Sequence, residues 1–149
     1  MGTIDIATSI AASPERCFDL ARDIDAHIAS ARGTEERAIG ARTHGLLGLG
    51  DEVTWEARHF GVPLRMTVRV TRFDRPRSFE DEMVRGPFRS MRHRHEFTPL
   101  GGGTMMRDLF EFTAPFGVLG WLAERLVLDG YMRRFLRRRA TALKAMAER

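Results

Sequence analysis

Residues 91–112 read MRHRHEFTPLGGGTMMRDLFEF, and this stretch decides the fold. Apolar and polar side chains alternate on both sides of three consecutive glycines. Side chains of a strand point to opposite faces in turn, and glycine permits the tight turn of a hairpin. The stretch therefore predicts two antiparallel strands. If Phe97 pairs with Met106 across the glycines, His95 stands opposite Asp108.

Four ionisable residues fall on the face of these strands that is otherwise apolar. His93 and His95 lie on the first strand and Asp108 on the second, and the preceding strand adds Asp81. Similar counting places Asp81 beside His93 or His95, which gives a row of acid, imidazole and acid across three strands. The same face carries Phe79, Met83, Met91, Phe97, Met106, Phe110 and Phe112. The opposite face carries the water-facing set Glu80, Glu82, Arg92, Arg94, Glu96, Arg107 and Glu111.

Further strands precede this hairpin, and short turns join them. From about residue 35 to residue 114 the chain reads as an antiparallel meander, with turns at 60–63, 74–77, 86–88 and 101–103. Glycine at the first central position of the 60–63 turn fixes the predicted pairing of its two strands. That pairing sets His59 opposite Leu64, Ala57 opposite Met66, and Trp55 opposite Val68.

The sequence pattern at both ends of the chain differs from that of the meander. Residues 3–10 alternate as a first strand, and Ser13 caps a helix that begins at Pro14. A second short helix runs from Ile24 to Ala31 and is closed by Gly33.

After Pro115 the pattern predicts one long helix over 118–147. Gly130 interrupts this helix and predicts a kink or a site of close approach. Tyr131 and Phe135 could close the interior from the helix, together with Leu122 and Leu126.

Composition narrows the class of protein. The 149 residues predict one domain, 1–149, and a net charge of +4 is too small to indicate a nucleic-acid partner. No signal peptide is visible, and the longest apolar stretch falls short of a membrane span. A single cysteine, Cys17, fits a cytoplasmic protein and reads as a buried helix residue. The basic run of Arg133, Arg134, Arg137, Arg138 and Arg139 favours a solvated helix face over an anionic-membrane patch.

The order of elements resembles the helix-grip fold of the START/Bet v 1-like (SRPBCC) superfamily, specifically its bacterial polyketide cyclase/dehydrase and lipid-transport proteins. The resemblance also rests on GLGDEVTW at 48–55, APFG at 114–117 and YMRR at 131–134. It implies an α+β fold in which a curved antiparallel sheet of about seven strands wraps a long C-terminal helix, with two short helices after the first strand. It further implies an apolar cavity between sheet and helix, and it transfers no catalytic residue.

These observations predict a protein that holds a small hydrophobic molecule, with the His/Asp row binding the polar end of that molecule. The expected ligand-binding residues are Trp55, His59, Met66, Asp81, Met83, His93, His95, Asp108, Phe110, Leu122 and Leu126. His27 and His44 are expected at the surface. No cofactor is expected.

Other interpretations stay open at this stage. The row can be a closed hydrogen-bond network with no ligand. It can also serve a cyclase or dehydratase in which His95 is the acid/base and Asp108 orients it. Two histidines and two aspartates could bind zinc or iron, but alternation alone produces such spacing, so no metal is expected. A homodimer that uses the sheet edge or a helix face is also possible.

Overall fold

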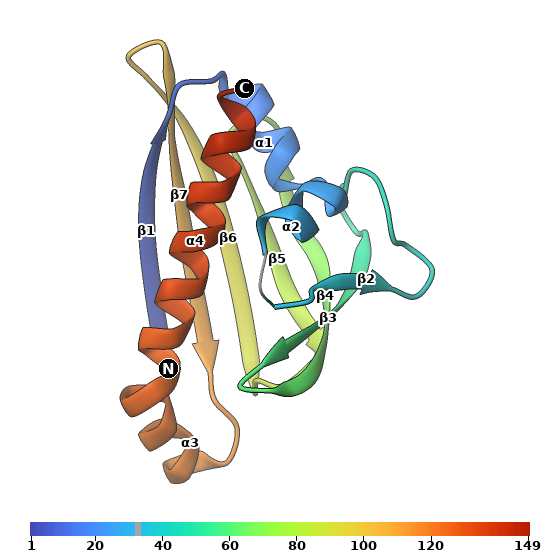
Figure 1. The fold of residues 1–149 in the computed structure, drawn as a ribbon, viewed down its shortest axis with the longest axis vertical. Coiled ribbons are helices and arrows are strands. Elements are labelled where there is room, and N and C mark those ends of the chain that lie inside the picture. Colours follow the sequence, from blue (N-terminus) through green and yellow to red (C-terminus); the bar gives the residue numbers. More distant parts are fainter. Residues whose placement is uncertain (32–33) are drawn as a thin grey trace.

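The computed structural model describes residues 1–31 and 34–149, and their strands form a seven-stranded antiparallel sheet (Figure 1). Its order is β1-β7-β6-β5-β4-β3-β2, so β2 to β7 form a meander and β1 pairs with β7. The strands are β1 (Gly2–Ile10), β2 (Arg37–Ile39), β3 (Glu52–His59), β4 (Val62–Asp74), β5 (Ser78–Arg85), β6 (Ser90–Leu100) and β7 (Gly103–Thr113). The predicted sheet is therefore confirmed.

Two short helices follow β1, as predicted. Ser13 caps α1 (Pro14–Ala21) by accepting a hydrogen bond from the Arg16 N–H at 3.2 Å, and Asp23 caps α2 (Ile24–Ser30). The predicted stop at Gly33 lies outside the described residues. Cys17 is buried in α1, as expected.

The C-terminal helical segment lies along one face of the sheet, and α1 and α2 cover the neighbouring part of that face (Figure 1). The segment comprises α3 (Gly117–Ala123), a π-helical turn η1 (Glu124–Leu128) and α4 (Asp129–Ala147). The apolar core lies between the two layers. Phe18 of α1 is fully buried there and makes edge-to-face contacts with Phe73, Phe79 and Phe97 at centroid distances of 5.2–5.4 Å. No helix among the described residues is long and apolar enough to cross a membrane.

The predicted register is confirmed for β6 and β7 but wrong for β3 and β4. Phe97 pairs with Met106, and His95 stands opposite Asp108. In the earlier hairpin, by contrast, the loop is Phe60-Gly61, and both residues have positive φ. Such a two-residue loop pairs His59 with Val62, Ala57 with Leu64, and Trp55 with Met66. The correction is a shift of two residues, so each side chain keeps its predicted face.

The long helix departs from the predicted regular helix at η1, which ends before Gly130, and it continues as a regular helix through Gly130. Around η1 the inward-facing position moves from Ala123 to Leu128, five residues later, because a π turn carries one extra residue. A Cβ added at Gly130 would meet no atom within 4 Å, so the expected close approach is absent there. The close approach occurs instead at Gly120, where a Cβ would lie 1.6 Å from the Pro115 carbonyl oxygen.

Candidate active site and ligand pocket

A pocket of about 470 Å³ lies between the sheet and the C-terminal helix. This volume falls within the range of small-molecule sites, and the walls are mainly apolar. The helical wall is formed by Leu119, Ala123, Leu128, Tyr131, Met132 and Phe135. The sheet wall includes Trp55, Met66, Val68, Phe79, Met91 and Phe110.

The four predicted polar residues form one connected cluster on the sheet side of this pocket. His93 Nε2 lies 3.0 Å from Asp108 Oδ1, and His95 Nε2 lies 3.0 Å from Asp81 Oδ2. His95 Nδ1 faces the same Asp108 oxygen at 3.4 Å. The order in space is therefore Asp81, His95, Asp108, His93. No described residue hydrogen-bonds to His93 Nδ1 or Asp81 Oδ1, so these two atoms are available to a ligand.

The charges within the cluster are set by burial and by the carboxylates. Burial opposes a charge on His95, but hydrogen bonds to Asp108 and Asp81 outweigh it and raise the pKa of His95 to about 9. Burial also opposes ionisation of Asp108, but hydrogen bonds from the two histidines hold the pKa of Asp108 well below its ordinary value. At neutral pH, His95 is therefore an imidazolium beside the Asp108 carboxylate.

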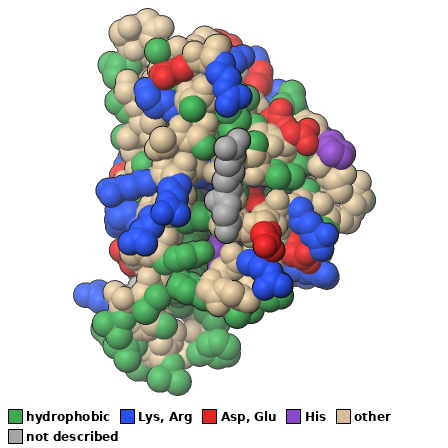
Figure 2. All heavy atoms as spheres, viewed as in Figure 1, with side chains coloured by type: hydrophobic (Ala, Val, Ile, Leu, Met, Phe, Trp, Pro, Cys, Tyr) green, Lys and Arg blue, Asp and Glu red, His purple; other side chains and the backbone are tan. Residues whose placement is uncertain are grey.

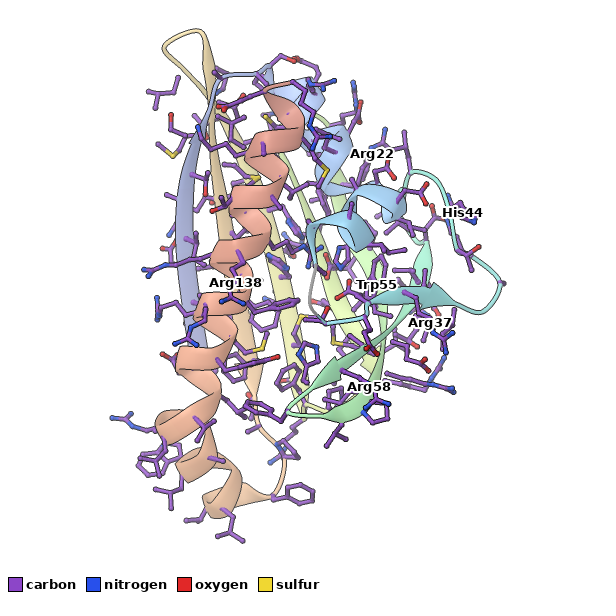
Figure 3. All side chains as sticks on the ribbon, viewed as in Figure 1. Arg22, Arg37, His44, Trp55, Arg58 and Arg138 are labelled. Carbon is purple, nitrogen blue, oxygen red and sulfur yellow. The ribbon has the colours of Figure 1, made fainter. Side chains whose placement is uncertain are left out.

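A second group of polar side chains lines the pocket near α2. The ring of His27 stacks on Trp55 of β3 with centroids 3.8 Å apart, and His27 Nε2 lies 2.6 Å from Glu36 Oε1. Trp55 is labelled in Figure 3, where it lies between β3 and α2. Burial raises the pKa of Glu36 to about 8, and the nearby His59 opposes this only in part. Sequence reasoning missed Glu36 and placed His27 at the surface, which is wrong because α2 folds over β3.

His59 and Tyr131 join the sheet to the helix at another part of the pocket wall. His59 Nδ1 hydrogen-bonds to the Tyr131 hydroxyl, so β3 and α4 are linked directly. Burial lowers the pKa of His59 and raises the pKa of Tyr131. Both shifts favour the uncharged forms, which suit an apolar pocket.

Arg139 of α4 also lines the pocket. No described residue forms an ion pair or hydrogen bond with its guanidinium. Burial lowers the pKa of Arg139, since an apolar setting disfavours the charge. The other pocket-lining arginine, Arg65, is paired with Glu56 at 2.7 Å. Sequence reasoning grouped Arg139 with the surface arginines, and only the fold of α4 separates it from them.

The structure brings most of the predicted binding residues to the pocket and leaves four outside its lining. Trp55, His59, Met66, Asp81, His93, His95 and Phe110 line it, as do the helix residues Tyr131 and Phe135. Asp108 lies behind the two histidines, and Met83 packs beside Gly86. Leu122 and Leu126 are 47% and 73% exposed, so their predicted role in closing the pocket is wrong. Leu119 and Ala123 form the pocket side of α3, which leaves Leu122 outside it, and Leu126 lies within η1, where Leu128 and then Met132 of α4 occupy the wall instead. His44 is exposed, as expected.

One metal-binding geometry exists within the cluster. Ligand atoms of Asp81, His93 and His95 lie within 4.8 Å of one another. A metal ion bound to His95 would have to displace a ring proton, from Nε2 beside Asp81 or from Nδ1 beside Asp108. Metal binding at this site would therefore release a proton and would weaken as pH falls.

Comparison with protein families identifies the chain. Residues 1–148 match the family described as polyketide cyclase / dehydrase and lipid transport. This chain belongs to that family. A comparison with curated protein sequences finds no match.

Solved structures with the same fold come from bacteria and plants. A protein of Thermus thermophilus is 18% identical, with a TM-score of 0.75 over 98% of this chain and 99% of that one. A START superfamily protein from Mycobacterium smegmatis is 16% identical, with a TM-score of 0.74 over 98% and 97%. The major latex-like protein 151 of Panax ginseng is 13% identical, with a TM-score of 0.66 over the same shares. At these identities the likeness establishes the helix-grip fold.

Proposed function

We propose that this protein, as one ligand-binding domain over residues 1–149, encloses a small hydrophobic molecule such as a lipid, a polyketide or an aromatic compound. The observation that carries the proposal is the pocket of about 470 Å³ with apolar walls and a few inward polar groups. The family description, which names lipid transport and polyketide cyclisation, agrees with this ligand class. The expected compartment is the cytoplasm.

The Asp/His cluster supplies the polar end of the proposed site. Its internal hydrogen bonds fix the two imidazole rings, which also stack on each other at 3.8 Å. His93 Nδ1 and Asp81 Oδ1 belong to side chains that line the pocket, so the cluster offers a rigid pair of atoms to a hydroxyl or amine group. A purely structural hydrogen-bond network would make the same internal bonds. Measurement of ligand binding therefore distinguishes a ligand-binding cluster from such a network.

The test is to fill the pocket and measure binding. Ala57 of β3 is buried and lines the pocket, whereas Ala7 of β1 is exposed on the other face of the sheet. Ala57→Trp should abolish binding of the neutral fluorophore N-phenylnaphthylamine, and Ala7→Trp should leave it unchanged. Mass spectrometry of the native parent protein should also detect a copurified apolar molecule. Equal binding by both variants, with no copurified molecule, would refute the proposal.

The alternative function is a cyclase or dehydratase that uses His95 and Asp108. The raised pKa of His95 favours a general acid over a general base at neutral pH. However, both ring nitrogens of His95 face carboxylates, so proton transfer to a substrate first requires one of these contacts to break. Binding without turnover of candidate polyketides supports the carrier, whereas turnover that His95→Gln abolishes supports the enzyme.

A further inference from the structure

Arg139 is a cation in an apolar pocket with no carboxylate of the described residues to neutralise it. Among the described residues, the other arginines without a partner lie on the surface, where water solvates them, but Arg139 lies on the inner face of α4 beside Leu136. A guanidinium stays charged in proteins, and a buried charge is stable when it is paired. Arg139 is only partly exposed and has no anion of the described residues beside it, so a bound ligand can supply the anion that its guanidinium lacks.

We propose that Arg139 binds an acidic group of the ligand, so that the pocket takes an apolar carboxylic acid or a similar apolar anion. This inference rests on the proposed function and names its ligand class. A carboxylate matches the planar fork of the guanidinium, which can donate two parallel hydrogen bonds. The ligand then lies with its acidic end at Arg139 and its apolar body along the pocket.

Two fluorophores of nearly the same shape test the inference. Anilinonaphthalene sulfonate is anionic, and N-phenylnaphthylamine is its neutral counterpart. Arg139→Met should weaken binding of the anionic probe by about tenfold or more, because a charge-assisted hydrogen bond is lost, and should leave the neutral probe unaffected. Arg139→Lys should restore part of the loss. Arg65→Met is the matched control, since it removes a pocket-lining arginine that already has a partner.

The outcomes separate this inference from the proposed function. If the parent protein binds neither probe, the proposed ligand pocket fails. If it binds both and Arg139→Met changes both affinities equally, the pocket stands and the acidic subsite is wrong. Displacement of the anionic probe by a long-chain fatty acid, but not by the corresponding alcohol, would support the subsite further.

A second inference concerns the outer surface around α3 and η1. Seven large apolar side chains are exposed in one stretch: Phe116, Val118, Leu119, Trp121, Leu122, Leu126 and Val127, at 47–84% of their full exposure. Figure 2 shows this apolar surface at the lower end of the molecule, with blue arginines of α4 directly above it. Phe116 and Leu119 also line the pocket, so the apolar surface borders its mouth. Exposed patches of this kind mark interaction sites.

The positive charges beside this apolar surface indicate which kind of partner it binds. Arg134, Arg137 and Arg138 project from α4 and have no ion-pair partner among the described residues, and Arg138 is labelled in Figure 3. They line a shallow groove together with Arg133. We infer that α3, η1 and this basic face of α4 dock on an anionic membrane surface. Apolar side chains then enter the interface while arginines contact lipid headgroups, and the pocket mouth faces the bilayer.

Vesicle binding tests the docking surface. The protein should co-sediment with vesicles of phosphatidylcholine and phosphatidylglycerol, and weakly with phosphatidylcholine alone. Arg137→Glu/Arg138→Glu should lower binding more than Arg42→Glu/Arg77→Glu, which makes the same change of net charge elsewhere on the surface. The chain has two tryptophans, and Trp55 is buried. A blue shift of emission on vesicles that Trp121→Phe removes would therefore report insertion of α3.

Two results would overturn the docking inference. One is equal sedimentation of both charge variants with anionic vesicles. The other is a dimer in light scattering that Leu126→Ser converts to a monomer, because the apolar surface would then belong to a second copy of the chain. Salt should weaken vesicle binding, since it screens the contribution of the arginines.

Discussion

At the residue scale, the length of the side chains determines which residues of the inward His/Asp row form hydrogen bonds with one another. His95 stands opposite Asp108 in the backbone register, yet its Nε2 bonds to Asp81, which stands opposite His93. Diagonal neighbours in an antiparallel sheet remain within reach of long side chains. The alternation of the sequence could predict which residues share the interior, but it could not decide between direct and diagonal partners.

Removal of Asp108 should change both the titration of His95 and the stability of the fold. In Asp108→Ala, His95 keeps only Asp81, so the opposing effect of burial should lower the pKa of His95 from about 9. Loss of a buried partner should lower the free energy of unfolding by roughly 1–3 kcal/mol. NMR titration and chemical denaturation measure the two effects.

A surface carboxylate provides the control for that experiment. Asp5 is exposed and pairs with Arg107 on the outer face of the sheet. Asp5→Ala should cost less than about 1 kcal/mol, because exposed ion pairs contribute little, and should leave His95 unchanged. An unchanged His95 pKa in Asp108→Ala would contradict the cluster.

At the scale of elements, the two glycines of the C-terminal segment should respond in opposite ways. Gly130 lies in α4 with open space around it, so Gly130→Ala should raise the free energy of unfolding by about 1 kcal/mol through helix propensity. Gly120→Ala should destabilise, because its Cβ would overlap the Pro115 carbonyl. Thermal denaturation of both variants checks the pair, and a loss of stability in Gly130→Ala would show that α4 packs more closely there than described.

The sequence predicts most elements because their signals are local. Alternation defines the strands, and Ser13 with Pro14 marks the start of α1. It does not predict the Phe60-Gly61 loop, where a phenylalanine takes a positive φ that asparagine or glycine would ordinarily occupy. Nor does it predict η1, because the stretch is apolar on several sides and no single face stands out.

At the scale of the whole molecule, the missed site residues share one cause. His27 of α2 and Glu36 just before β2 lie far along the chain from Arg139 of α4, and all three line the pocket only when the helices fold over the sheet. Each looks like a surface residue in its own segment. The inward row, by contrast, lies on adjacent strands joined by short turns, so local counting is enough to find it.

The buried ionisable groups together should set the pH dependence of stability. Glu36 has a folded pKa of about 8, above its ordinary 4.5, so the native state binds more protons between these values and stability falls as pH rises through them. His95 acts in the same direction between 6.5 and about 9. Asp108 has a lowered pKa, so its contribution is present above 3.8 and is lost as pH falls below that value.

The three contributions place the maximum of stability at about pH 4, above the 3.8 at which Asp108 begins to lose its contribution and below the 4.5 at which Glu36 begins to lose its own. Denaturation midpoints in urea measured across the pH range should therefore decline from there toward pH 9. Glu36→Gln should flatten the decline below about pH 6.5, where His95 does not yet titrate, and should leave between 6.5 and 9 only the smaller decline that His95 contributes. Asp108→Ala should reduce that second decline, because it brings the pKa of folded His95 closer to its unfolded value. A maximum at alkaline pH in the parent protein would mean that neither Glu36 nor His95 is held protonated in the folded state.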